Sequence, residues 1–135
     1  MKIRHRMIVF DAADLDAESK FWAGMLGGAV DGGDRWRNIW VDGDWQLGIQ
    51  LAPNHVPPDW PDGTPQQVHL DLYVDDFDAA HEQAIALGAR LLKAADDRAA
   101  SRGAQVYADP AGHPFCLCWL PPTTDQRSAG APSVP

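Results

Sequence analysis

The strongest constraint on the fold is an internal repeat, because the same succession of local patterns occurs twice along the chain. Each copy starts with alternating apolar and polar residues, continues with an aspartate suited to cap a helix, and ends that helix at Leu-Gly. Asp14 matches Asp76 in this repeat, and Leu26-Gly27 matches Leu87-Gly88. Three further strand patterns follow each helix. The repeat predicts an α+β fold of two βαβββ modules, each a short curved mixed sheet with its helix on one face.

The first module is expected over about residues 3–52. Its opening strand is predicted from Ile3 to Phe10, and its helix from Leu15 to the glycine at position 27. Three strands should follow, starting at Ala29, at Arg35 and, after the tight turn Asp42-Gly-Asp44, near residue 46. The pattern therefore places all five elements before Pro53.

The second module is expected over about residues 66–120. The predicted elements are a strand from Gln66 to Val74, a helix from Phe77 to Leu87, and strands over 89–93, about 104–108, and through Trp119. Between the modules, residues 53–65 contain five prolines and no periodicity, which is typical of a linker. Residues 121–135 are rich in Pro, Ser, Thr and Ala and are predicted to be a disordered tail.

Composition narrows the class of partner. A formal charge of −8 and an isoelectric point near 4.8 disfavour nucleic acid and favour neutral or cationic small molecules. No apolar run reaches the roughly 18 residues of a membrane span, and Met-Lys-Ile-Arg-His-Arg at the start leads into a strand pattern and not into the apolar region of a signal peptide. A cytoplasmic location is therefore predicted. Cys116 and Cys118 are two residues apart, a Cα separation of roughly 6.7 Å in a strand, so both are predicted to be reduced thiols.

Two such sheets side by side are expected to leave their helix-free faces around one cleft for a small-molecule ligand. The strand alternation assigns one polar or aromatic side of each strand to that cleft. Six tryptophans are many for 135 residues, and an aromatic wall suits flat or cationic ligands. His69 is expected near the centre of the cleft, and the expected lining residues are His5, Met7, Trp36, Asn38, Trp40, Gln50, Asp71 and Cys116.

Several motifs resemble the vicinal oxygen chelate superfamily, which includes glyoxalase I, bleomycin-resistance proteins and extradiol dioxygenases. They are Phe21-Trp22 followed by Leu26-Gly27, and Asp109-Pro-Ala-Gly before the last strand. The stretches 68–76 and 109–116 are most similar to small bacterial glyoxalase-like domain proteins. The resemblance covers about residues 3–120 and implies a homodimer, but it does not specify a reaction, because this fold hosts several chemistries.

The resemblance also implies where a divalent metal would bind. The family's ligand positions fall on Met7, His69, Gln50 and Cys116, so three of the four depart from the usual His and Glu. A thioether and a neutral amide are poor ligands for Ni, Zn, Mn or Fe(II). A set of His5, His69 and Cys116 would suit zinc chemically, but His5 is displaced by about 6.7 Å along its strand, against a bond of about 2 Å. The sequence therefore predicts no resident metal cofactor.

Two functions remain open. In the first, the chain is a lyase or isomerase acting on a carbonyl metabolite, with His69 as acid, base or ligand and with Gln50, Asp71 and Cys116 orienting the substrate. In the second, it is a metal-free protein of the bleomycin-resistance type that sequesters an aromatic or cationic compound. A structural alternative exists for each residue: His69 bonded to Asp71 within the fold, and Cys116 as an inert buried thiol.

Overall fold

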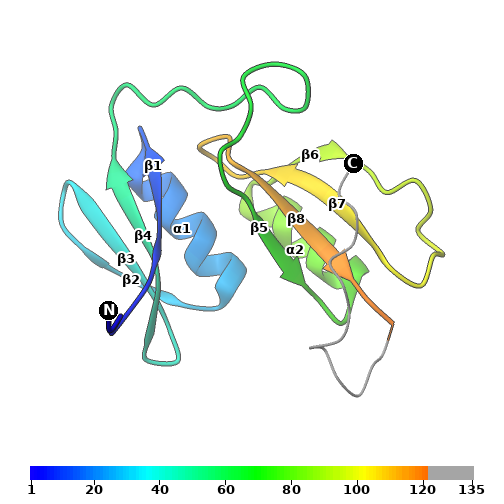
Figure 1. Ribbon diagram of the computed structural model, residues 1–135, viewed down its shortest axis with the longest axis horizontal. Coiled ribbons are helices and arrows are strands. Elements are labelled where there is room, and N and C mark those ends of the chain that lie inside the picture. Colours follow the sequence, from blue (N-terminus) through cyan, green and yellow to red (C-terminus); the bar gives the residue numbers. More distant parts are fainter. Residues whose placement is uncertain (122–135) are drawn as a thin grey trace. The chain divides into compact units, whose positions relative to one another are not determined.

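The computed structural model describes residues 1–121 and divides the chain into two compact units (Figure 1). The first unit comprises Met1–Pro57, and the second begins at Pro58. The boundary falls within the proline-rich segment predicted as a linker. The predicted disordered tail lies outside the described residues, apart from Pro121.

The first unit forms one four-stranded mixed sheet with one helix, as the repeat predicts. Its strands have the order β1-β4-β3-β2, in which β1 and β4 are parallel and the other pairs antiparallel. The elements are β1 (Ile8–Ala12), α1 (Leu15–Leu26), β2 (Ala29–Gly32), β3 (Trp36–Val41) and β4 (Asp44–Leu51).

The second unit repeats this topology. Its sheet has the order β5-β8-β7-β6, again with one parallel pair, β5 with β8. The elements are β5 (Leu70–Tyr73), α2 (Phe77–Leu87), β6 (Arg90–Lys93), β7 (Gly103–Ala108) and β8 (Pro114–Trp119). The predicted fold of two βαβββ modules is therefore confirmed.

The two helices begin and end by the same local chemistry. Asp14 and Asp76 are the N-caps, and each side chain accepts a hydrogen bond of 3.0 Å from the backbone N–H three residues later. Gly27 and Gly88 end the helices in the left-handed region, with φ of 67° and 112°, which residues with a Cβ adopt only at a cost. The cap aspartates and the Leu-Gly ends therefore set both helix boundaries as predicted.

Two strands start later than the sequence suggested. The first was expected from Ile3 but begins at Ile8, and the strand expected from Gln66 begins at Leu70. The reason is the parallel partner strand, because β4 and β8 supply pairing residues only for 8–12 and 70–73. Val68, assigned to the core side by alternation, lies ahead of β5 and is 63% exposed.

The core of the first unit is aromatic and lies between α1 and its sheet. Trp22 is fully buried, with ring centroids 5.3 Å from both Phe10 and Phe21. Its indole N–H donates a 3.1 Å hydrogen bond to the Glu18 carboxylate one turn earlier. Burying one aromatic side chain of this size removes about 150–250 Å² of surface from water. Trp22 is therefore the main anchor of the helix.

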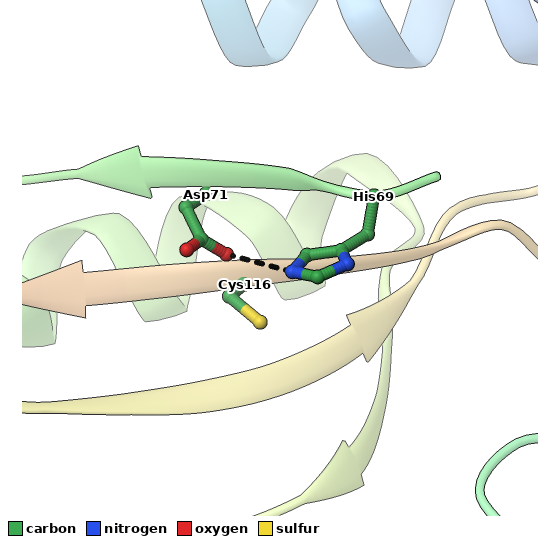
Figure 2. A group of neighbouring side chains, drawn as sticks. All are labelled: His69, Asp71 and Cys116. Atoms are coloured by element: carbon green, nitrogen blue, oxygen red, sulfur yellow. Dashed lines mark ion pairs between the residues drawn. The ribbon is translucent and has the colours of Figure 1, made fainter. Parts of the chain in front are cut away.

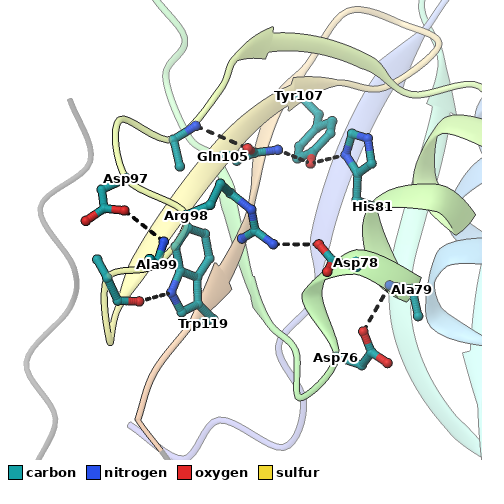
Figure 3. A network of polar contacts seen from close by, with 12 residues as sticks. Asp76, Asp78, Ala79, His81, Asp97, Arg98, Ala99, Gln105, Tyr107 and Trp119 are labelled. Atoms are coloured by element: carbon teal, nitrogen blue, oxygen red, sulfur yellow. Dashed lines mark hydrogen bonds and ion pairs between the residues drawn. The ribbon is translucent and has the colours of Figure 1, made fainter.

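On the helix side of the second sheet, a polar chain connects α2 to β7 (Figure 3). The buried Tyr107 hydroxyl lies 2.7 Å from His81 Nδ1 and accepts a 2.8 Å hydrogen bond from Gln105 Nε2. The Gln105 carbonyl oxygen in turn accepts 3.2 Å from the Ala95 N–H. Each polar atom in this chain is thus paired inside the sheet–helix layer, where an unpaired group would be costly.

Arg98 fastens the β6–β7 loop to the same layer. Its guanidinium lies 3.6 Å from the centroid of Phe77 and 4.7 Å from that of Trp119, and it pairs with Asp78 at 2.7 Å (Figure 3). The Trp119 indole donates 2.9 Å to the Ala100 carbonyl. Gly103 leaves the space that this indole fills. The loop is therefore held by a cation–π contact and an ion pair together.

Candidate functional site

The helix-free face of the second sheet gathers the chemically active side chains of that unit. In the parallel β5–β8 pair, Asp71 lies opposite Cys116 and Tyr73 opposite Cys118. Trp119 packs edge to face on Phe77 of α2 at 4.9 Å, so the alternating residues Cys116 and Cys118 lie on the other face.

His69, Asp71 and Cys116 form one group on this face (Figure 2). Each offers one ligand atom, and these atoms all lie within 4.8 Å of one another. His69 Nε2 is 3.3 Å from Asp71 Oδ1, and Gln66 Nε2 is 3.4 Å from His69 Nδ1. The His69 and Asp71 side chains retain 33% and 23% of their exposure, whereas Cys116 is buried. A ligand can therefore reach the imidazole and the carboxylate more readily than the thiol.

Cys116 is held as a neutral thiol. Its hydrogen bond with Cys118, its burial and the negative charge of Asp71 all raise the pKa of the Cys116 thiol far above its ordinary value. Cys118 is also a free, buried cysteine, as predicted from the spacing of the two. The thiolate is the form that attacks electrophiles and binds metals, so Cys116 is poorly suited to either role.

The corresponding face of the first unit is organised differently. Matching Asp14 with Asp76 relates Val9 to Asp71, and Val9 lies opposite Gly48. Gly48, two residues before Gln50, is therefore the structural counterpart of Cys116. Gln50 lies opposite Asp11 instead. Because alternation fixes a face but not a register, the sequence could not separate positions 48 and 50.

The indole of Trp36 occupies the space above Gly48. A Cβ at position 48 would lie 2.5 and 2.9 Å from two carbons of that ring. The indole is held in place because its N–H donates 2.5 Å to Asn38 Oδ1, and Asn38 Nδ2 donates 2.6 Å to Asp31. An aromatic ring thus fills the space at the position that corresponds to Cys116 in the second unit.

We expect Gly48→Ala to lower the free energy of unfolding by about 1–3 kcal/mol, because the new methyl group overlaps the Trp36 ring. Urea unfolding followed by circular dichroism measures the change. Gly33→Ala is the matched control, since a Cβ there meets no atom within 4 Å. Equal effects at the two positions would contradict the packing of Trp36 over Gly48.

The remaining predicted residues of the first unit lie in two groups. Trp40 and His5 both stack on Trp45, with centroids 5.8 and 5.4 Å away. Met7 is half-buried just before β1. Trp40, Trp45 and His5 thus form an aromatic stack.

The donor atoms present fit a hard divalent ion poorly. In the first unit the ligand positions hold a thioether and a glycine covered by an indole. In the second unit, Asp71 joins His69 and Cys116, a partner that the predicted set of His5, His69 and Cys116 did not include. Both His69 ring nitrogens already have polar neighbours, and the third donor is a protonated thiol. The usual metal of the superfamily therefore lacks a complete set of ligands among the described residues of either unit.

Hydrogen bonds within the turn Asp109-Pro-Ala-Gly-His113 close it before β8. Asp109 Oδ1 accepts a 2.8 Å hydrogen bond from the His113 backbone N–H, and the imidazole Nδ1 lies 3.0 Å from Oδ2. The Asp109 carboxylate is buried inside this turn. It positions β8, and with it Cys116, against β5.

Comparison with known proteins agrees with this architecture. Residues 7–118 match the model of the glyoxalase-like domain family. No curated protein matches the sequence. No helix in residues 1–121 is long and apolar enough to cross a membrane.

Solved structures of the same fold cover nearly the whole chain. The fosfomycin resistance protein FosX from Mesorhizobium loti is 18% identical with a TM-score of 0.67, over 96% of this chain and all of that one. A glyoxalase-related enzyme from Fulvimarina pelagi is 20% identical with a TM-score of 0.62, over 87% and 88% of the two chains.

A third similar structure is a glyoxalase/bleomycin resistance protein/dioxygenase family enzyme from Burkholderia phytofirmans, 18% identical with a TM-score of 0.66 over 84% and 96%. At these identities the structures establish the fold and not an activity. Together with the family match and the repeated modules, they confirm that the chain belongs to the glyoxalase-like domain family of the vicinal oxygen chelate superfamily.

Proposed function

We propose that this glyoxalase-like domain binds a small molecule on the helix-free face of its second sheet, without a resident metal ion. The observation that carries the proposal is the state of the His69, Asp71 and Cys116 group. The imidazole is placed between Gln66 and Asp71, and the thiol is protonated. The face thus offers a carboxylate and hydrogen-bonding groups to a ligand, but no ready thiolate.

The Asp71 carboxylate is the strongest recognition element of this face. Its Oδ1 is buried and lies 3.3 Å from His69 Nε2, while the side chain as a whole keeps 23% of its exposure. A ligand that donates a hydrogen bond to the exposed part of this carboxylate should therefore gain affinity. Hydrogen bonds to a charged group contribute about 1.5–3 kcal/mol.

Metal independence gives the first test. We expect protein purified without tag or chelator to retain only substoichiometric metal after incubation with Ni, Zn, Mn or Fe(II), because the ligand set is incomplete. Elemental analysis of wild type and His69→Ala measures this. Near-stoichiometric metal in wild type that is lost in His69→Ala would overturn the metal-free site.

Ligand binding gives the second part of that test. A small-molecule screen by tryptophan fluorescence, with chelator present throughout, should yield binders whose affinity falls about tenfold or more in Asp71→Asn. Asp75→Asn is the matched control, since Asp75 lies beyond the end of β5 and is exposed. Binding that requires added metal, or that is insensitive to Asp71, would count against the proposal.

A second candidate function is acid–base catalysis by His69 on a carbonyl compound. The specific observation in its favour is the Asp71 carboxylate beside Nε2, because a carboxylate orients an imidazole and stabilises its protonated form. The superfamily's lyase and isomerase chemistries would use such a pair. Turnover of a bound compound that is abolished in His69→Gln, with binding retained, would distinguish this function from sequestration.

A further inference from the structure

Trp60 belongs to the second unit and packs on the same face as the candidate site. It lies in the proline-rich segment predicted as a linker, yet it is half-buried against the cluster of Val106, Cys116 and Cys118. Two further apolar residues, Leu92 and Ala104, pack against this cluster. The segment therefore supplies a side chain to the sheet and is more than a connection.

A closed turn presents this tryptophan. The Asp59 N–H donates 2.9 Å to the Thr64 carbonyl, and the Gly63 N–H donates 2.7 Å to the Asp59 carbonyl. A Cβ at Gly63 would overlap the Asp59 side chain, so the turn requires glycine at this position. The backbone on both sides of Trp60 is thus fixed by hydrogen bonds that lie within residues 59–64.

Cys116 connects the tryptophan to the polar group. It is a member both of the apolar cluster under Trp60 and of the group with His69 and Asp71. Strand β8, which carries Cys116, lies between β5 with Asp71 and β7 with Val106. The indole, packed on the cluster of Val106, Cys116 and Cys118, and the Asp71 carboxylate opposite Cys116 therefore lie on one face of this sheet.

The chemistry of these neighbours favours a positively charged ligand. Among aromatic side chains, the indole of tryptophan attracts a cation over its face most strongly. Asp71 supplies a negative charge beside it, whereas Cys116 is neutral. The net charge of −8 adds a field that draws cations to the whole chain.

We propose that Trp60 is the aromatic wall of the His69 and Asp71 site and that the site takes an organic cation, such as a substituted ammonium compound. The charged group pairs with Asp71 while its alkyl or aryl surface lies against the indole. This inference rests on the proposed metal-free binding function and adds to it a ligand class and a specificity-determining residue.

Three probes of similar size test whether the ligand must be positively charged. They are the cation benzyltrimethylammonium, the neutral benzyl alcohol and the anion benzoate, each titrated calorimetrically with chelator present. Benzyltrimethylammonium should bind wild type most tightly. Its affinity should fall about tenfold or more in Trp60→Ala and less in Trp60→Phe, which retains an aromatic wall with a weaker cation–π contact. Trp45→Phe, in the first unit, is the matched control and should bind as wild type does.

Each alternative outcome has a distinct meaning. Tighter binding in Trp60→Ala would show that the indole fills the site as a plug, and equal binding of benzoate would remove the charge requirement; either overturns the inference. Binding of a neutral or anionic compound that depends on Asp71 but not on Trp60 overturns it while leaving the proposed function intact. Failure of wild type to bind these probes or any compound in the fluorescence screen would overturn both. Trp60→Phe also guards against a folding defect, which thermal unfolding of each variant measures.

Discussion

Trp22→Ala should lower the free energy of unfolding by about 3–5 kcal/mol, the usual cost of deleting a large buried aromatic side chain. Trp22 is fully buried between Phe10 and Phe21, and its N–H bonds to Glu18 on the same helix. The truncation removes both the apolar contacts and that hydrogen bond. Since small domains have only about 5–15 kcal/mol of stability in total, the variant should be largely unfolded on modest heating.

Urea unfolding monitored by circular dichroism gives the measurement for Trp22→Ala. Trp45→Ala is the matched control, because Trp45 is a half-buried tryptophan of the same unit and stacks on Trp40 and His5 at the surface. Its loss of stability should be clearly smaller. Equal losses for the two variants would mean that α1 is not anchored by Trp22.

Alkaline pH should destabilise the folded chain, because a buried thiol must stay protonated in it. The pKa of Cys116 is raised in the folded state by its hydrogen bond to Cys118, by burial and by Asp71. The folded chain therefore keeps a proton that the unfolded chain releases near the ordinary thiol value of 9.0. The stabilisation is fully present below pH 9.0 and is lost progressively above it, by up to about 1.4 kcal/mol per pH unit for one group.

Tyr107 should add to this loss at higher pH. Burial raises its pKa above the ordinary value of 10.0, although the hydrogen bond from Gln105 opposes the shift. Urea unfolding midpoints at about pH 7, 9, 10 and 11 measure the combined effect, because this series covers the ordinary pKa values of both cysteine and tyrosine. Cys116→Ala should flatten the decline that begins near pH 9.0, and Tyr107→Phe the part above pH 10.0. Identical slopes in wild type and both variants would contradict the buried, protonated state of these groups.

The fold could be predicted from the sequence because the signals that start and end its helices are local. An aspartate followed by an amphipathic run and a Leu-Gly end specifies a helix without reference to the rest of the chain, and both copies have this signature. Strand starts were less predictable, since pairing partners far along the chain decide them. Ile3 and Val68 alternate correctly with their neighbours but have no strand beside them.

The site was predictable only in part, for a similar reason. His69, Asp71 and Cys116 were each singled out, but their grouping depends on the β5–β8 register, which places Asp71 directly opposite Cys116. In the first unit, the β1–β4 register likewise decides that Gly48, and not Gln50, corresponds to Cys116. Trp60 was not identified, because a proline-rich segment has no periodicity that could assign its side chains to a face. Its tight turn, with glycine at position 63, is the one local signal that could have pointed to an ordered segment.

The indole over Gly48 makes a carboxylate at position 48 difficult to introduce. A glutamate placed there while Trp36 remains would meet the ring at its first side-chain carbon. Removing Trp36 first would leave a void above a glycine and would take from Asn38 Oδ1 the indole N–H that it accepts. Either single substitution should lower the stability of the fold, so one substitution alone would not place a carboxylate on this part of the sheet.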